Sequence, residues 1–272
     1  KTKCSNYRPI SLLSNISNIF EGAMYNRIEL FLKDFDIIYK NQFGFRKHHS
    51  TQHALTAIID KIRANIDNKT FSAAVFIDLE KAFDTVNHDI LLSKLDNYGI
   101  SQNANNWVRS YLTNREQNVS LNGVVSSNKK ITCGVPQGSI LGPLLFLLYI
   151  NDLNLALKNC SVFHFADDTN LLFECKNPRL LHKVINKEFQ ILYDWLCANR
   201  LSLNAAKTEF IIFRPPRTNL NTQVTLKLNG ITIYESPKIK YLGIILDNRL
   251  SWKHHISELC KKLGRTLGMI YK

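Results

Sequence analysis

Apolar positions along this 272-residue chain switch between a helical spacing and a strand spacing, without an internal repeat. The helical spacing predicts helices at residues 15–35, 51–67, just before Gly99, around 107–112, at 141–158 and at 178–200. Strand-like runs predict a strand at 71–77, a hairpin at 117–132, two short strands around 162–173 and a meander at 209–246. Since these elements mix without βαβ regularity, the sequence predicts an α+β fold.

Two adjacent aspartates, Asp167 and Asp168, interrupt an apolar stretch at the point where the chain turns between two short strands. Two carboxylates about 4 Å apart repel each other by roughly 1–4 kcal/mol. A divalent cation would offset that charge. The alternative is a solvated Asp-Asp turn that binds no metal.

A third aspartate, Asp78, ends the run 71–77, whose consecutive apolar residues are typical of a strand buried on both faces. A helical pattern follows, so Asp78 lies at a strand-to-helix exit, where ligands bind in α/β architectures. We interpret nearby Asp84 as the N-cap of that helix. If the strand neighbours the Asp167 turn, three carboxylates converge and suit two Mg²⁺ ions for phosphoryl transfer.

The charge and cysteine content restrict the partners and the compartment. A net charge of +13 favours a polyanion partner, although a basic protein without one is the alternative. The six cysteines have no zinc-ligand spacing and suit a reducing, intracellular compartment. The longest apolar run, 140–150, is too short to span a bilayer, so we expect no membrane association. We interpret the chain, which begins at Lys1, as part of a larger polypeptide.

Seven ordered segments resemble reverse transcriptases. FIDLEKAFD (76–84), GVPQGSILGP (134–143) and FADD (165–168) resemble their core motifs. The segments that resemble the non-LTR retrotransposon branch (LINE-type, jockey-like) are NYRPISLL (6–13), NQFGFRKHHST (41–51), LSLNAAKTE (201–209) and YLGIILD (241–247).

This resemblance implies a right-hand polymerase with an antiparallel palm sheet flanked by helices. The implied divisions are fingers at 1–70, a palm at 71–247 and the start of a thumb at 248–272. Segment 100–133 either belongs to the palm or returns to the fingers. The implied activity is RNA-directed DNA polymerisation, which extends a 3′-hydroxyl with dNTPs. An RNA-dependent RNA polymerase and an inactive nucleic-acid-binding remnant are the alternatives.

The resemblance also implies cofactors and partners. These are two Mg²⁺ ions, with Mn²⁺ as a substitute, an RNA template, a DNA primer or target, dNTPs, and a nuclease domain elsewhere in the polypeptide. The implied location is the nucleus or a cytoplasmic ribonucleoprotein.

By the same resemblance, Asp78, Asp167 and Asp168 are the catalytic metal ligands. Phe83 resembles an aromatic steric gate that excludes a ribose 2′-hydroxyl, which is a form of negative selection against ribonucleotides. The alternative is that Phe83 is a core phenylalanine.

Further nucleotide-binding candidates are Gln137 and Gly138 in the pocket, Arg46 and Lys47 on the triphosphate, and Lys207 as a phosphate contact or proton donor. Candidate nucleic-acid contacts are Arg8 with the template backbone and the hairpin Tyr241, Leu242 and Gly243 as a primer grip. Lys207 could equally be a solvated surface charge, and Tyr241 a core residue. Ser139 is predicted to cap the helix that follows it.

Overall fold

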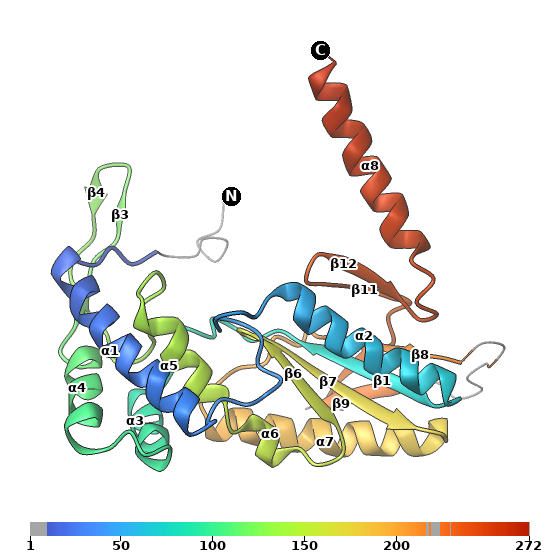
Figure 1. The fold of residues 1–272 in the computed structure, drawn as a ribbon, viewed down its shortest axis with the longest axis horizontal. Coiled ribbons are helices and arrows are strands. Elements are labelled where there is room, and N and C mark those ends of the chain that lie inside the picture. Colours follow the sequence, from blue (N-terminus) through green and yellow to red (C-terminus); the bar gives the residue numbers. More distant parts are fainter. Residues whose placement is uncertain (1–9, 216–217, 219–223, 229, 272) are drawn as a thin grey trace.

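A four-stranded antiparallel sheet forms the centre of the molecule (Figure 1). The structure is a computed structural model that describes residues 10–271 except 216–217, 219–223 and 229, so Arg8 lies outside the described residues. The strand order is β6 (Ser161–Phe165), β7 (Asp168–Cys175), β1 (Phe71–Ile77) and β8 (Glu209–Phe213). The sheet with helices on its two faces confirms the predicted α+β class.

Strand β1 is central and all seven of its residues are buried. Alternate side chains of a strand point to opposite faces of a sheet. Accordingly, Ala73, Val75 and Ile77 join the larger apolar cluster, whereas Ala74 and Phe76 join the smaller cluster on the opposite face. This explains why the sequence of β1 is continuously apolar instead of alternating.

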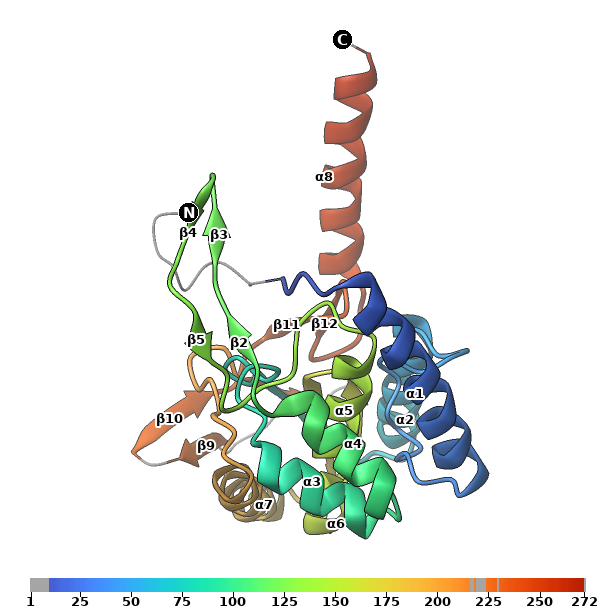
Figure 2. The ribbon, with the colours of Figure 1, turned by 90° about the vertical axis from the view of Figure 1, so that its left-hand side faces the viewer.

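The two clusters define the layers around the sheet. On one face lie α2 (Thr51–Asp67) and the hairpin of β11 (Lys238–Tyr241) and β12 (Ile244–Asp247). On the other face lies α7 (Pro178–Ala198). The remaining helices group beside the sheet, as Figures 1 and 2 show: α1 (Asn15–Asp34), α3 (His88–Asn97), α4 (Gln102–Leu112) and α5 (Leu141–Ile150).

Two elements extend to the same side of this body (Figures 1 and 2). One is a narrow hairpin in which β2 (Glu116–Gln117) pairs with β5 (Lys129–Lys130) and β3 (Ser120–Leu121) pairs with β4 (Val124–Val125). It confirms the hairpin predicted at 117–132. The other is α8 (Lys253–Ile270), which has no buried residue. No helix in the described parts of the chain combines the length and apolar character that a bilayer crossing requires.

Three sequence predictions about element boundaries are wrong. Helix 141–158 stops at Ile150, because Asn151 donates to Ile37 O (2.8 Å) and accepts from Tyr39 N (2.8 Å), and only α6 (Leu153–Ala156) follows. Asp84 does not cap α3, since the side chain of Asn87 accepts from Ile90 N.

The predicted meander at 209–246 is also not one sheet. Strand β8 belongs to the central sheet, while β9 (Thr225–Leu228) pairs with β10 (Ile231–Tyr234) separately. The turn predicted at 229–230 has its first residue outside the described residues.

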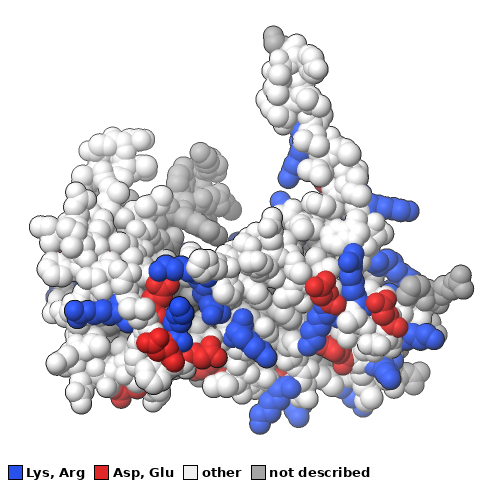
Figure 3. All heavy atoms as spheres, in the orientation of Figure 1, with Lys and Arg blue, Asp and Glu red and all other residues white. Residues whose placement is uncertain are grey.

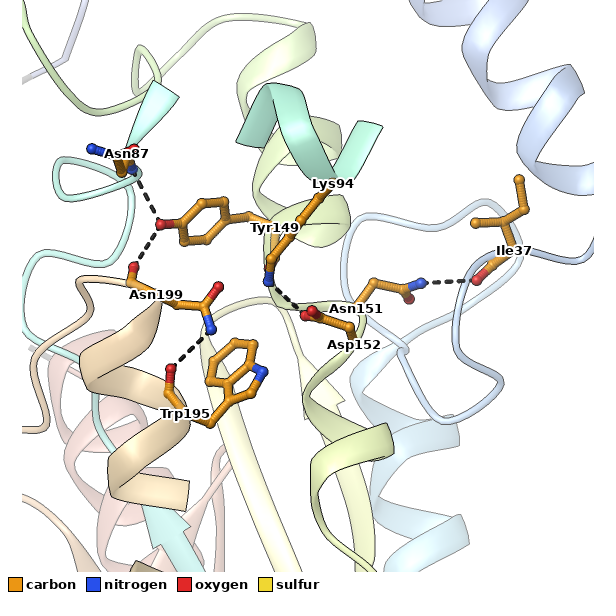
Figure 4. Close-up of polar contacts among 8 residues, drawn as sticks. All are labelled: Ile37, Asn87, Lys94, Tyr149, Asn151, Asp152, Trp195 and Asn199. Atoms are coloured by element: carbon orange, nitrogen blue, oxygen red, sulfur yellow. Dashed lines mark hydrogen bonds and ion pairs between the residues drawn. The ribbon is translucent and has the colours of Figure 1, made fainter. Parts of the chain in front are cut away.

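A half-buried cation joins three helices that lie far apart in sequence (Figure 4). Lys94 of α3 donates to Tyr149 O of α5 (2.7 Å) and to Asp152 Oδ1 (2.6 Å). Its ammonium also lies 5.0 Å from the ring centre of Tyr149 and 4.7 Å from that of Trp195 in α7. Burial lowers the pKa of Lys94, and the hydrogen bond to Asp152 opposes that shift. Asp152 and the two rings therefore stabilise the charged form of the ammonium.

Replacing Lys94 by methionine should lower the free energy of unfolding by about 3 kcal/mol, because Asp152 loses its partner in a mostly buried site. Urea denaturation measures the change. The matched control is Lys261→Met, which removes an exposed pair with Glu258 at 3.7 Å and should cost less than about 1 kcal/mol. Equal effects of the two substitutions would contradict the structural role of Lys94.

Candidate active site

The three predicted aspartates lie at one end of the central sheet. Phe165 pairs with Asp168, so Ala166 and Asp167 are the two turn residues between β6 and β7. Ile77, the last residue of β1, pairs with Thr169 of β7. The residue after Ile77 is Asp78, so the backbone of β1 ends next to the turn. The condition set by the sequence analysis, that the Asp78 strand neighbours the strands of the Asp167 turn, is therefore met.

Two of the three carboxylates lie near side chains that are not acidic. Asp78 Oδ2 lies 3.6 Å from the ammonium of Lys207. Asp168 is exposed, and its charge adds to burial in raising the pKa of Tyr241. Among the residues that the structure describes, no three or more His, Cys, Asp or Glu side chains form a group that could hold a metal ion. The predicted convergence of three side chains is therefore not found, although the three backbone positions do converge.

The donor chemistry at this end of the sheet nevertheless fits magnesium. Mg²⁺ takes oxygen ligands and is held by one or two carboxylates, with water and substrate phosphates in the other positions. Asp78 and Asp167 are both partly exposed, so their oxygens are accessible to such an ion. A closed cage of protein ligands is not required for this type of site.

Lys207 is brought to Asp78 by the backbone. Leu203 forms an antiparallel bridge with Leu79, and Asn204 N donates to Asp78 O (2.9 Å). The turn that follows, in which Lys207 N donates to Asn204 O (3.1 Å), directs the exposed lysine toward the aspartate. The predicted nucleotide-binding residue Lys207 thus lies beside the predicted metal ligand.

The loop at 41–45 is attached directly to the aspartate turn. Phe43 N donates to His164 O (2.8 Å), and His164 N donates to Asn41 O (2.9 Å), as a short parallel bridge along β6. The buried side-chain oxygen of Gln42 accepts from Gly44 N (2.9 Å) and from Ala166 N (3.2 Å). One amide thereby holds both the loop and the turn.

Gly44 allows this attachment because it has no side chain. A Cβ atom at this position would lie 2.0 Å from Ala166 N, far inside van der Waals contact. Only glycine therefore fits where the loop crosses the turn.

The two predicted triphosphate contacts have partners within the protein. Arg46 Nη1 donates to Gln42 O (3.1 Å) and Tyr39 O (3.3 Å), and burial lowers the pKa of its guanidinium. The ammonium of Lys47 lies 2.7 Å from Glu29 Oε2 on α1. Arg46 stabilises the loop here, and Lys47 connects the loop to α1.

The turn at 134–139 lies against the segment that follows β1. Gln137 Nε2 donates to Asp84 Oδ1 (2.9 Å), and Val135 N donates to Phe83 O (2.8 Å). Gly138 has φ +102°, and a Cβ there would lie 3.3 Å from Ser11 O. Gln137 is therefore hydrogen-bonded to the residue that follows Phe83, while Gly138 lies against Ser11. Their shared role in one nucleotide pocket stays a prediction.

Helix α5 begins directly after this turn and has two side-chain caps. Ser139 Oγ accepts from Gly142 N (2.8 Å), which confirms its predicted capping role. The buried carboxylate of Glu21 accepts from Ile140 N (2.9 Å) and Leu141 N (3.2 Å), where the helix dipole favours negative charge.

Sequence reasoning missed both Glu21 and Gln42. Glu21 lies in the predicted helix 15–35, and Gln42 lies in the loop that follows it. Each has a structural role only through hydrogen bonds to a segment far away in the sequence. A signal existed for Gln42, since it lies within the segment 41–51 that resembles reverse transcriptases.

Phe83 is half-buried in a row of three aromatic rings. Its ring stacks on the buried ring of Phe146, with centres 4.6 Å apart and an angle of 25°. The ring of Phe45 meets it at 6.1 Å and 87°. One face of the Phe83 ring packs in the core, and the residue is still partly exposed. Its role as a steric gate stays a prediction.

The predicted primer-grip residues form the turn of the β11–β12 hairpin. Leu242 and Gly243 both have positive φ, which is the pattern of a type I′ turn. Tyr241 is buried, and its ring centre lies 5.1 Å from that of Phe76 in β1. Tyr241 is a core residue at the base of the hairpin, while Gly243 is exposed at its turn.

Comparison with known proteins decides the family. The sequence profile described as "Reverse transcriptase (RNA-dependent DNA polymerase)" matches residues 1–246. The chain belongs to the reverse transcriptase family. This agrees with the geometry, since the matched range includes the three aspartates and the turn at 134–139.

Relatives of this reverse transcriptase come from mobile elements. It is 33% identical over 266 residues to the RNA-directed DNA polymerase from mobile element jockey of Drosophila melanogaster, covering 95% of this chain and 28% of that protein. It is 31% identical over 269 residues to the probable RNA-directed DNA polymerase from transposon BS of the same species, covering 94% and 29%. The chain therefore spans less than a third of the length of these relatives.

Solved structures support the fold. Telomerase from Candida tropicalis, in complex with a fragment of telomeric RNA, has a TM-score of 0.58 at 14% identity, covering 86% of this chain and 36% of that one. Telomerase from Candida albicans has a TM-score of 0.57 at 14% identity, covering 85% and 37%. The right-hand polymerase architecture predicted from the sequence is confirmed at the level of the fold.

The stability of this reverse transcriptase should fall on acidification because of His164, which is fully buried behind the aspartate turn. Burial lowers its pKa from 6.5 to about 4. The unfolded chain takes up the proton first, so the stabilisation is complete above pH 6.5 and is lost between pH 6.5 and 4. We expect His164 to account for a loss of about 3 kcal/mol in unfolding free energy between pH 7 and 4.

Urea denaturation at several pH values tests this expectation. His164→Gln should flatten the dependence on pH, whereas His254→Gln, which changes an exposed histidine, should leave it as in the wild type. An unchanged pH profile in the His164 variant would refute the assignment.

Proposed function

We propose that this chain is the polymerase domain of a non-LTR retrotransposon reverse transcriptase, which extends a nucleic-acid 3′-hydroxyl with dNTPs on an RNA template. The observation that carries the proposal is the strand register that brings the end of β1, and so Asp78, next to the Asp167 turn. The mobile-element relatives support it, since the chain aligns with them over more than nine-tenths of its length.

In this proposal Asp78 and Asp167 bind two Mg²⁺ ions, for which Mn²⁺ can substitute, and Asp168 assists them. When bound, such ions activate the attacking oxygen and neutralise the charge that develops on the leaving group. The 3′-hydroxyl loses its proton to water and its oxygen bonds to the α-phosphorus of the dNTP. The bond from that phosphorus to the oxygen that bridges the α- and β-phosphates breaks, and pyrophosphate leaves. The chain contributes mainly by positioning these groups.

The other residues hold the substrates. Lys207, which lies beside Asp78, is suited to a phosphate oxygen or to protonating pyrophosphate. Gln137 and Gly138 line the nucleotide pocket, and Phe83 selects the sugar. Arg46 and Lys47 would contact the triphosphate only after exchanging their present partners, Gln42, Tyr39 and Glu29.

The fingers, palm and thumb divisions follow from this proposal: residues 1–70, 71–247 and 248–272. The template contact assigned to Arg8 and the primer contacts assigned to Leu242 and Gly243 belong to it as well. Lys and Arg are spread over the face in Figure 3 with Asp and Glu among them, so no single basic patch defines the nucleic-acid path there. With a net charge of +13, RNA binding should weaken as salt rises.

The relatives are several times longer than this chain. We therefore propose that it functions within a larger polypeptide with a nuclease domain, in the nucleus or in a cytoplasmic ribonucleoprotein.

Incorporation of dTTP on an RNA template with a DNA primer tests the proposed function in the longer polypeptide. Asp167→Asn should reduce incorporation by about a hundredfold or more while RNA binding is retained. The control is Asp60→Asn, which removes one exposed carboxylate from α2 and should have no effect. If the wild type binds RNA but incorporates nothing, the chain is an inactive nucleic-acid binder.

A further inference from the structure

We propose that Phe45 positions the ring of Phe83 and thereby contributes to discrimination between dNTPs and ribonucleotides. This inference rests on the proposed function, because it assigns a sugar-selecting role to Phe83. Phe45 is not among the residues for which the sequence suggests a role. It lies in the loop at 41–47, and Phe83 follows β1, so the contact joins two segments far apart in the chain.

The row of rings fixes Phe83 from two directions. Phe146 supports one face of the ring, at 4.6 Å and 25°, and is itself fully buried. Phe45 approaches at 6.1 Å and 87°, which is the edge-to-face arrangement that aromatic pairs favour. The Phe83 backbone is fixed as well, through the bond from Val135 N to its carbonyl. Rotation of the Phe83 ring away from Phe146 is therefore opposed by Phe45.

The residues before and after Phe45 are both held by contacts with the rest of the protein. Gly44 lies against Ala166, and Gln42 binds Gly44 N and Ala166 N together. Arg46 donates to Gln42 O and Tyr39 O. These contacts restrict the backbone of Phe45, so its ring can hold the Phe83 ring in one orientation.

The conformation of Phe45 also costs energy. Its φ of +52° lies in the left-handed region, which is uncommon for a residue with a side chain. Its ring remains 49% exposed. Core packing alone would not favour a strained backbone that leaves an aromatic ring half in solvent, whereas a role at a ligand pocket explains both features.

The same contact links sugar selection to the aspartates. Gln42 and Gly44 bind the turn that carries Asp167, and Phe45 follows Gly44 directly. The position of the Phe83 ring, which would lie under the sugar, thus depends on the same backbone that carries Asp167, a proposed metal ligand. A shift of the loop would therefore move the Phe83 ring and the Asp167 turn together.

The test compares dCTP with CTP, which differ only in the 2′-hydroxyl, using the longer polypeptide on an RNA template with a DNA primer. Phe45→Ala should lower the ratio of kcat/KM for dCTP to that for CTP by about three- to tenfold, the effect of one aromatic contact. Phe45→Tyr, which keeps the ring, should restore the wild-type ratio. Phe83→Val should lower the ratio further.

A double variant distinguishes positioning from an independent effect. If Phe45 acts through Phe83, adding Phe45→Ala to Phe83→Val should cause no further change in the ratio. Additive effects, or an unchanged ratio in Phe45→Ala, would overturn the proposal. Phe35→Ala is the matched control, since Phe35 is 68% exposed and its ring contact is with Phe31 at 4.8 Å.

A binding measurement separates this inference from the proposed function. With a primer that ends in a dideoxynucleotide, no bond can form, and equilibrium binding of dCTP and CTP can be compared directly. Phe45→Ala should narrow the difference between the two Kd values. A wild type that binds dCTP selectively but does not polymerise would refute the function and keep the inference, whereas equal Kd differences in the wild type and Phe45→Ala would refute the inference alone.

Discussion

The pairing of β1 with β7 is the interaction on which the rest of the structure depends. Seven consecutive buried residues hold β1 in the centre of the sheet, and its two faces support separate apolar clusters. A shift of one residue in this pairing would exchange the two faces and expose apolar side chains. The hydrophobic core therefore fixes the register, and the register fixes the position of Asp78 relative to the turn of Asp167. Stability and the geometry of the polar end of the sheet have the same origin.

Around that sheet end, neighbouring segments are held by polar side chains that satisfy backbone groups. The side chain of Gln42 accepts hydrogen bonds from the 41–45 loop and from the turn, and Glu21 accepts hydrogen bonds at the start of α5. The side chain of Asn151 joins the end of α5 to the segment at 37–39. Each is a buried or half-buried group whose hydrogen bonds would be costly to lose. These contacts add to the larger apolar cluster, which the helices beside the sheet share with β1 and β7.

The sequence predicted features that depend on local patterns. The buried strand before Asp78, the turn at Asp167 and the Ser139 cap can be inferred from residues close together in the chain, and the structure confirms them. The break after Ile150 could not be inferred, because it depends on the bonds of Asn151 with a segment more than a hundred residues away. The choice of Asn87 over Asp84 as the N-cap depended on where α3 begins. The rings that meet Phe83 likewise come from distant segments, so its half-buried environment was visible only in the fold.

The crossing of Gly44 over Ala166 has a consequence for how relatives of this chain diverge. Because a Cβ atom at position 44 would lie 2.0 Å from Ala166 N, any other residue there would separate the 41–45 segment from the β6–β7 turn. Position 44 is therefore expected to stay glycine in every functional sequence, although the turn that restricts it lies far away in the chain. In a mobile element that accumulates substitutions, a side chain at this position would mark a copy whose polymerase has lost its shape.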